Sequence, residues 1–206
     1  MPTKHPSPSS RNDDQAGEMP KALEGEKEGE RVDSMIEGVL PPRKQVKTPI
    51  DLRNVMRYFP SAVTVVTSAL DTGELFGLTV SAFISVSLEP PLVLISIRNE
   101  STAKDLLIKS GKYCVNILSA AQQDIAVKFS LTGEAGRFLG LDYYIGKNGN
   151  PIIRNCIGYL DCRITQVIPA GDHTLFLAEV VDLFGQKKEP LLYVDREYVR
   201  LENRID

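Results

Sequence analysis

The sequence contains no tryptophan, and it has too few histidines and cysteines for several classes of site. Of its 206 residues, two are histidine and three are cysteine. The cysteines Cys114, Cys156 and Cys162 show no CxxC spacing, which disfavours both a disulfide framework and a zinc site. We therefore interpret them as small, reduced core residues and expect no metal.

The chain also lacks a large excess of charge of either sign. Its 24 Lys and Arg against 27 Asp and Glu give a formal net charge of -3. Binding to nucleic acid or anionic lipid releases counterions and needs a basic excess, so neither is expected as the main partner. No apolar run is long enough to span a bilayer, and the N-terminus does not follow the pattern of a secretory signal. We expect a cytoplasmic protein with no nucleic-acid or membrane partner.

The N-terminal segment lacks aromatic side chains, since all seven Tyr and all seven Phe come after residue 50. The stretch "SPSSRNDDQAGEMPKALEGEKEGERVDSM" is instead rich in Ser, Pro, Gly and charged residues. Such a segment cannot bury enough apolar surface to offset the entropy lost on ordering. We predict a disordered arm over residues 1–48, either a passive tail or a tether, followed by one domain over residues 49–206.

From residue 51 the pattern becomes rich in strands. "DLRNVMRYF" predicts a short helix ended by Pro60. "SAVTVVTSAL", the turn "DTGE" and "LFGLTVSAFISVS" predict a hairpin, and "PLVLISI" predicts a buried strand. Ser101 and Ser119 are positioned to cap two further helices, and later strands are expected at "YCVNIL", "CIGYLDCRITQVI", "HTLFLAEVVDLF", "LLYVD" and "EYVRL". This order is typical of a mainly β fold with short helices, arranged as a small antiparallel β-barrel.

Residues 75–88 contain no charged residue, although 25% of the chain is charged. In an extended strand the apolar members would share one face, expected to be the barrel interior: Leu78, Val80, Ala82, Ile84, Val86 and Leu88. The other face would carry four hydroxyls and one aromatic ring: Thr79, Ser81, Phe83, Ser85 and Ser87. Solvent exposure is the usual interpretation of such a face. Its lack of charge suits equally well an uncharged ring system, a phosphate, or a subunit interface.

Five segments occur in a fixed order: "FPSAVTVVTS", "GLTVSAFISVSLEPPLVLISI", "NESTAKDLLIKSGKYCVNIL", "AVKFS" and "AGDHTLFLAEVVD". Together they resemble the flavin reductase-like domain family, which includes the NAD(P)H-dependent flavin reductases of two-component monooxygenases. The resemblance covers residues 51–201. It implies an FMN-binding split β-barrel that forms a homodimer and binds FMN or FAD near the subunit interface. It also implies NADH or NADPH as the reductant and a flavin-dependent monooxygenase as a partner.

The resemblance also implies a cofactor-binding site. It places a first segment beside the isoalloxazine: Thr79, Val80, Ser81, Ala82 and Phe83. It gives further flavin contacts to Ser85, Val86 and Ser87, and to an "FS" pair, Phe129 and Ser130. The family more often has Ala-Asn-Ser where this chain has Val-Ser-Ala. For Phe129 alone, core packing is the alternative.

A phosphate site is expected at the start of the helix that is predicted in the segment "NESTAKDLL". The N–H groups after Ser101 and Thr102 can receive a phosphate, and Lys104 adds positive charge. Ordinary helix capping is the alternative function of the same two residues, and it is compatible with phosphate binding.

His173, in "AGDHT", is the only histidine after residue 50. The pattern alone indicates a hairpin turn with a solvated histidine. The resemblance implies that nicotinamide meets flavin there, which makes His173 the predicted catalytic residue. The resemblance implies hydride transfer carried mainly by the cofactors. This would explain why the sequence has no GxGxxG motif and no nucleophile elbow. Two alternatives stay open: a flavin-binding or electron-transfer module without turnover of free flavin, and a barrel that binds no flavin.

Overall fold

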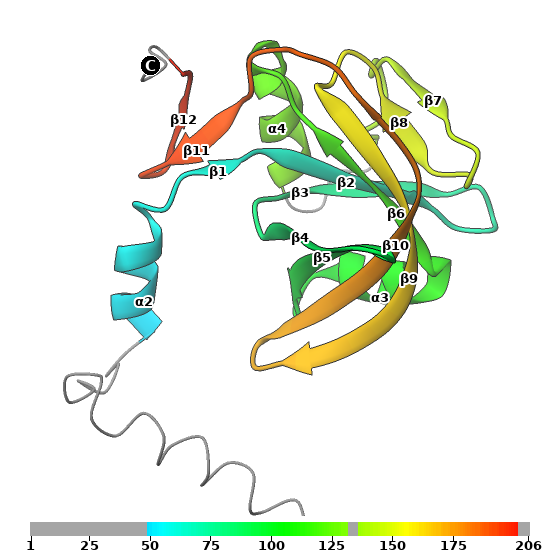
Figure 1. The fold of residues 1–206 in the computed structure, drawn as a ribbon, viewed down its shortest axis with the longest axis horizontal. Coiled ribbons are helices and arrows are strands. Elements are labelled where there is room, and N and C mark those ends of the chain that lie inside the picture. Colours follow the sequence, from blue (N-terminus) through cyan, green and yellow to red (C-terminus); the bar gives the residue numbers. More distant parts are fainter. Residues whose placement is uncertain (1–48, 132–135, 202–206) are drawn as a thin grey trace, which may run out of the picture. The chain divides into compact units, whose positions relative to one another are not determined.

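The computed structural model describes residues 49–131 and 136–201, all of which belong to one compact unit of the chain. The predicted arm, residues 1–48, lies outside the described residues. Figure 1 shows a strongly curved sheet accompanied by short helices. Within the described ranges, no helix is both long and apolar enough to cross a membrane.

Seven strands form the main sheet in the order β3-β2-β6-β9-β10-β5-β4, and every neighbouring pair is antiparallel. They are β2 (Thr64–Ala69), β3 (Leu75–Val80), β4 (Phe83–Leu88), β5 (Pro91–Arg98), β6 (Lys112–Ile117), β9 (Gly158–Ala170) and β10 (His173–Gly185). Among the described residues no ladder joins the edge strands β3 and β4, so the sheet stays open between them. The predicted mainly β, antiparallel fold is confirmed.

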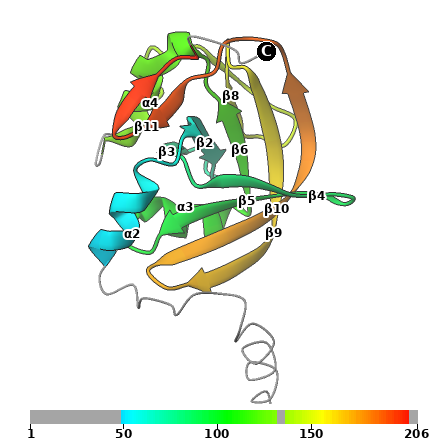
Figure 2. The same ribbon diagram turned by 60° about the vertical axis from the view of Figure 1, so that its left-hand side comes forward.

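The remaining elements are short. The helices are α2 (Pro49–Met56), α3 (Thr102–Ser110), the 3-10 helix η1 (Ala120–Gln122) and α4 (Gln123–Ser130). Two small sheets complete the described fold: β1 (Ser61–Ala62) with β11 (Leu192–Val194) and β12 (Glu197–Val199), and β7 (Tyr143–Ile145) with β8 (Pro151–Ile153). Helix α3 packs against β2, β3, β5 and β6 (Figure 2).

Strand β2 lies between two core clusters, because its two faces are both buried. Val66 belongs to a cluster with Phe176 of β10 and Leu107 of α3. Val65 belongs to the other cluster, which includes Phe129 of α4. A Cβ on Gly77 of β3 would lie 2.8 Å from Cε1 of Phe129, so glycine is needed for α4 to approach β3 this closely.

The single strand predicted over residues 75–87 is in fact two strands. Strand β3 ends at Val80, and β4 begins at Phe83 on the opposite edge of the sheet. Between them the chain turns at Ser81 and Ala82, which we call the β3–β4 corner. The Ala82 carbonyl accepts a hydrogen bond from the N–H of Ser96 on β5, and the Ser81 carbonyl accepts one from Phe83, each at 3.0 Å. The alternation of faces therefore does not continue from β3 into β4.

The corner reverses the direction in which the apolar side chains of β4 point. Val80, before the corner, is buried as predicted. Beyond it, Ile84, Val86 and Leu88 are 57%, 48% and 89% exposed, whereas Phe83 packs against the core. The prediction that these three apolar side chains face the interior is wrong, because a shift by one residue exchanges the two faces of a strand.

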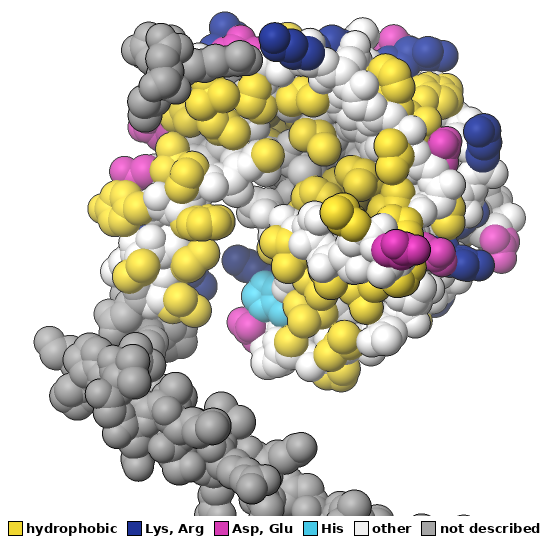
Figure 3. Space-filling view, in the orientation of Figure 1, with side chains coloured by type: hydrophobic (Ala, Val, Ile, Leu, Met, Phe, Trp, Pro, Cys, Tyr) yellow, Lys and Arg dark blue, Asp and Glu magenta, His cyan; other side chains and the backbone are white. Residues whose placement is uncertain are grey.

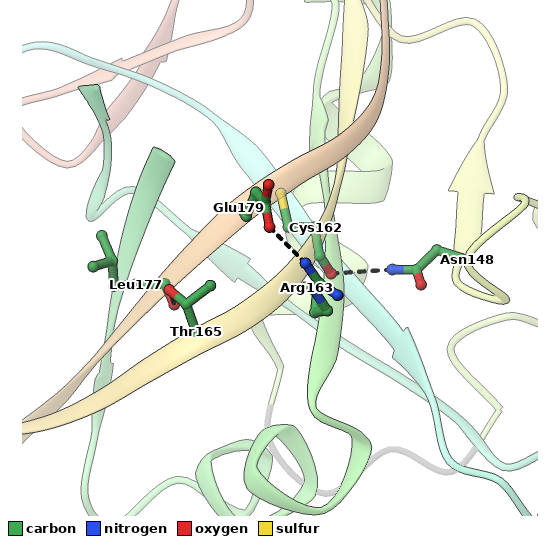
Figure 4. A network of polar contacts seen from close by, with 6 residues as sticks. All are labelled: Asn148, Cys162, Arg163, Thr165, Leu177 and Glu179. Atoms are coloured by element: carbon green, nitrogen blue, oxygen red, sulfur yellow. Dashed lines mark hydrogen bonds and ion pairs between the residues drawn. The ribbon is translucent and has the colours of Figure 1, made fainter. Parts of the chain in front are cut away.

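Strands β9 and β10 form a long hairpin whose pairing has two register shifts. Figure 4 shows some of its polar side chains from close by, among them Thr165, Arg163 and Glu179. Next to one shift, the Thr165 hydroxyl donates to the Leu177 carbonyl at 3.1 Å. Arg163 and Glu179 lie directly opposite each other, and Nη2 of the arginine is 2.7 Å from Oε2 of the glutamate. Such bulges bend a strand pair and increase its twist. The hairpin turn, at Gly171 and Asp172, carries His173 at its exit.

Candidate functional site

Strand pairing places His173 beside the end of β5. His173 is the first residue of β10, and its register partner is Arg98, the last residue of β5. Nδ1 of His173 lies 2.8 Å from Oδ1 of Asp172, and this hydrogen bond lowers the pKa of the Asp172 carboxyl. The His173 side chain is 35% exposed, so a ligand can reach the imidazole.

Asn99 connects the β9–β10 turn to the start of α3. Its N–H donates to the Asp172 carbonyl at 3.0 Å, and its Nδ2 donates to the Gly171 carbonyl at 3.2 Å. Its Oδ1 accepts a hydrogen bond from the Thr174 hydroxyl at 2.7 Å. These three bonds hold the His173 turn against the loop that leads into Ser101. The sequence analysis missed Asn99, although an asparagine between a strand end and a helix cap is a turn signal.

The start of α3 provides groups that suit an anion. Ser101 is the N-cap residue, and its side chain makes no capping hydrogen bond to the described residues. Its hydroxyl and the first-turn N–H groups can therefore point to a ligand. Nζ of Lys104 lies 3.2 Å from Oδ1 of Asp105, and the lysine side chain keeps 25% exposure. Arg98 is exposed three residues before Ser101 and adds a second positive charge.

The β3–β4 corner lies next to this region through β5. Ala82 is hydrogen-bonded to Ser96, which is two residues before Arg98 on the same strand. Ser81 and Ala82 are both exposed. The structure therefore brings together three of the predicted segments at one end of the sheet: the corner, the start of α3, and His173. We call this arrangement the His173 site.

The other predicted residues have different surroundings. The Thr79 hydroxyl donates to the Ala126 carbonyl of α4 at 2.7 Å. Phe129 is 1% exposed within the second core cluster, and the Ser130 hydroxyl donates to the Val127 carbonyl inside α4. Each of these side chains thus has a structural partner on or under α4.

Ser85, Val86 and Ser87 continue along β4 away from the corner. Ser85 pairs with Val93, and Ser87 pairs with Leu92, with a register shift between the two pairs. These serines therefore lie toward the opposite end of β5 from Arg98. Their side chains are exposed or half-buried, so they line the open surface beside the sheet edge.

A cavity of about 480 Å³ adjoins the His173 site at Thr102. Its walls come from β3, from α3 and from residues 136–143. Among the described residues predicted to bind cofactor, Thr102 is the one that lines it. The cavity is therefore separate from the corner and from His173, and it meets them at the first residue of α3.

Comparison with known proteins identifies relatives of the whole described fold. Residues 56–202 match the sequence profile of the family described as flavin reductase like domain. A flavin reductase from Pseudomonas putida is 35% identical over 150 residues, which cover 71% of this chain and 88% of that protein. The reductase subunit HsaB of a flavin-dependent monooxygenase from Mycobacterium tuberculosis is 32% identical, covering 75% of this chain and 83% of that protein.

A solved structure shows the same architecture. The NADH:FAD oxidoreductase SgcE6 of Streptomyces globisporus, in complex with NAD and FAD fragments, has 32% sequence identity and a TM-score of 0.74. The match covers 81% of this chain and 100% of that one. The five ordered segments quoted from the sequence all fall within the range of the profile match.

Proposed function

The chain belongs to the flavin reductase-like domain family, and from that premise we propose that it is an NAD(P)H-dependent flavin reductase. In this proposal the enzyme transfers hydride from NADH or NADPH to FMN or FAD. The observation that carries the proposal is the His173 site, where the exposed β3–β4 corner, the start of α3 and His173 meet. These three segments are among those that the sequence analysis assigns to the cofactors.

The residues of the His173 site fit a flavin. The exposed residues Ser81 and Ala82, next to the uncharged surface of β4, suit a neutral polar ring. The N-terminus of α3, with Arg98 and Lys104 nearby, suits a phosphate because both the backbone N–H groups and the side chains favour negative charge. When bound, the flavin supplies the ring that accepts hydride.

The protein's part is to position the reactants. Asn99 fixes the turn that carries His173, and Asp172 holds the imidazole through Nδ1. We assign His173 to the nicotinamide, which it orients against the flavin ring. Holding two rings at contact distance lowers the entropy cost of their reaction.

We assign the flavin ring to the corner and to β4. The corner, Ser81 to Phe83, contacts the isoalloxazine, and the segment Ser85 to Ser87 lines the same open surface farther along the strand. Thr79, Val80, Phe129 and Ser130 act through backbone contacts or through packing beneath the ring, since their side chains are buried or already hydrogen-bonded.

We further propose that the enzyme is a homodimer. Apolar side chains gather on the face that carries β4, β9 and β10 (Figure 3). Exposed apolar residues of these three strands are Ile84, Val86, Leu88, Val167, Ile168, Leu183 and Phe184. An exposed apolar surface is typical of a protein–protein interface. Covering it with a second copy would enclose the flavin site at the edge of β4.

The HsaB relative is the reductase subunit of a flavin-dependent monooxygenase. By analogy we propose that this enzyme supplies reduced flavin to a partner monooxygenase in the cytoplasm, where NADH is available. An open site at a sheet edge favours the exchange of flavin that such a supply requires.

The test is oxidation of NADH and of NADPH by the purified protein while FMN or FAD is titrated in. A rate that saturates with added flavin would support a reductase of diffusible flavin. Absence of turnover with either nucleotide, together with a visible flavin spectrum, would contradict the proposal and identify a flavin-binding module.

A further inference from the structure

The cavity beside Thr102 has the size of a small-molecule site. Its volume of about 480 Å³ lies within the range of roughly 300–1,000 Å³ that such sites occupy. Phe76 of β3 and Leu106 of α3 contribute to its walls, and Arg137 and Phe138 contribute from the loop before β7. Because Thr102 is also the first residue of α3, the cavity begins where the proposed phosphate site ends.

Arg137 provides an unused donor in the cavity wall. Its Nη1 donates to the Gly77 carbonyl at 2.7 Å, and its Nη2 donates to the Leu131 carbonyl. Its Nε is buried and has no hydrogen-bond partner among the residues that the structure describes. A guanidinium carries five N–H donors, and these two carbonyls use only two of them. Because Arg137 lines the cavity, a phosphate or a ring nitrogen bound there could accept from a further Nη N–H.

Aromatic rings form much of the remaining wall. The ring of Phe138 packs edge-on against Phe129, with centroids 5.3 Å apart, and against Tyr143, with centroids 5.4 Å apart. These contacts fix Phe138, and Phe76 lines the cavity from β3. Glu74, also in the wall, offers a carboxylate that can accept from an amino or hydroxyl group. Aromatic faces beside a guanidinium are typical of sites for a nucleobase with a phosphate.

We propose that this cavity binds the adenosine phosphate end of a dinucleotide whose reactive ring lies at the His173 site. This inference rests on the proposed flavin reductase function and extends it. Both FAD and NADH carry such an end, whereas FMN and reduced nicotinamide mononucleotide lack it. The cavity would therefore make the enzyme prefer a dinucleotide over the corresponding mononucleotide for one of its two substrates.

The test fills the cavity with a larger side chain. In Leu106→Trp the indole occupies the space proposed for adenosine. Ile108→Trp is the matched control, because Ile108 lies on the same helix, is 51% exposed and is not among the residues that line the cavity. ADP is titrated into each protein by calorimetry, and thermal melting checks that each variant is folded. We expect Leu106→Trp to weaken ADP binding by about tenfold or more, because the indole would displace the nucleotide and the loss of one charge-assisted hydrogen bond alone has that effect. We expect Ile108→Trp to leave ADP binding unchanged.

Two ratios then identify the dinucleotide whose adenosine end binds in the cavity. If that dinucleotide is FAD, the ratio of FMN to FAD dissociation constants falls toward one in Leu106→Trp. If the source is NADH, the ratio of KM values for reduced nicotinamide mononucleotide and NADH falls instead. ADP that does not bind the unmodified protein, or that binds all three proteins equally, would overturn the inference.

A second variant keeps the test valid if Leu106→Trp does not fold. Arg137→Gln removes the guanidinium and should weaken ADP more than adenosine, while equal effects on both would overturn the phosphate contact. The outcome is independent of turnover. ADP binding that depends on the cavity, without any flavin reduction, would contradict the proposed function alone, and flavin reduction with insensitive ADP titrations would contradict this inference alone.

Discussion

Asp161 is a fully buried carboxylate in β9. Its Oδ1 accepts hydrogen bonds from Nδ2 of Asn150 at 2.7 Å and of Asn148 at 3.3 Å. Its Oδ2 has no partner among the described residues. Burial raises the pKa of this carboxyl above its ordinary value, and the asparagine hydrogen bonds oppose the shift. The folded protein therefore retains a proton at a pH where the unfolded chain has lost it.

This difference predicts how stability depends on pH. Because the folded state binds more protons, the contribution of Asp161 to the free energy of unfolding falls as pH rises from about 4, the ordinary aspartate value, to the folded pKa. Asp161→Asn removes the titration, so its stability relative to the unmodified protein should rise over that interval and then level off. Urea unfolding from pH 4 to pH 8 measures this difference. Asp71→Asn, at an exposed turn, is the control, and parallel curves for the protein and Asp161→Asn would contradict the prediction.

Substitutions of Thr79 can test whether its hydroxyl stabilises the fold or contacts the flavin. Its hydroxyl holds β3 to α4 through the Ala126 carbonyl. Thr79→Val should lower the free energy of unfolding by about 1 kcal/mol, the usual contribution of one such bond, and should leave flavin affinity unchanged. Thr79→Ser keeps the hydroxyl and should behave like the unmodified protein. A loss of flavin affinity without a loss of stability would instead place the hydroxyl on the flavin.

His173 should act on the nicotinamide rather than on the flavin. We expect His173→Ala to raise the KM for NADH, or to slow flavin reduction, by about tenfold, the effect of losing one good hydrogen bond. Steady-state kinetics and a parallel flavin titration separate the two substrates. Asp172→Asn keeps the imidazole and weakens only its Nδ1 partner, so its effect should be smaller. Unchanged kinetics in His173→Ala would leave this residue as an ordinary turn histidine.

At the scale of elements, short-range signals in the sequence predict most of the fold. Helix α3 is capped at its C-terminal end by Gly111, whose φ of 65° lies in the left-handed region that favours glycine. Ser119 caps the next helical segment as predicted and forms a capping box with Gln122, although the first turn it caps is the 3-10 helix η1 rather than an α-helix. Such signals are local because each cap bonds to residues within a few positions along the chain.

The β3–β4 corner shows where local patterns are insufficient. Nothing in the alternation of residues 77–87 marks Ser81 and Ala82 as a turn. The chain bends there because Ala82 bonds to Ser96 on β5, a strand formed by a later part of the sequence. The side of the sheet to which Ile84 and its neighbours point depends on this contact, which is distant in sequence. The sequence therefore predicted extended structure here, but it missed the break into two strands and assigned the wrong face to β4.

At the scale of the whole molecule, the candidate site could also be predicted only where local sequence motifs determine it. Ser101 and His173 could be predicted because they lie in segments with a family resemblance. Asn99 and the cavity wall at Arg137 could not, because their significance arises only when the β9–β10 turn reaches α3 and when residues 136–143 cover β3. Positions in a motif are visible in a sequence, whereas a cavity between three elements is not.

The outward face of β4 has consequences for assembly. A soluble protein rarely exposes a continuous apolar surface without a partner. Here Ile84, Val86 and Leu88 project from an edge strand, and Leu183 and Phe184 of β10 are also exposed. An edge strand with such side chains invites association unless another surface covers it. In the proposed dimer, a second copy provides that cover and completes the wall of the flavin site.

A single charge on this surface should therefore disrupt both assembly and flavin binding. In Ile84→Lys, a lysine would have to be buried in the proposed interface, and desolvation of an unpaired charge strongly disfavours association. Ile108→Lys is the matched control, since Ile84 and Ile108 are 57% and 51% exposed but lie on different elements. We expect size-exclusion chromatography with light scattering to show a dimer for the unmodified protein and for Ile108→Lys, and a monomer for Ile84→Lys. Flavin affinity should fall about tenfold or more in the monomer, because the ring loses one wall of its site. A monomeric unmodified protein would contradict the dimer, and a monomeric Ile84→Lys that keeps full flavin affinity would show that each subunit holds its flavin alone.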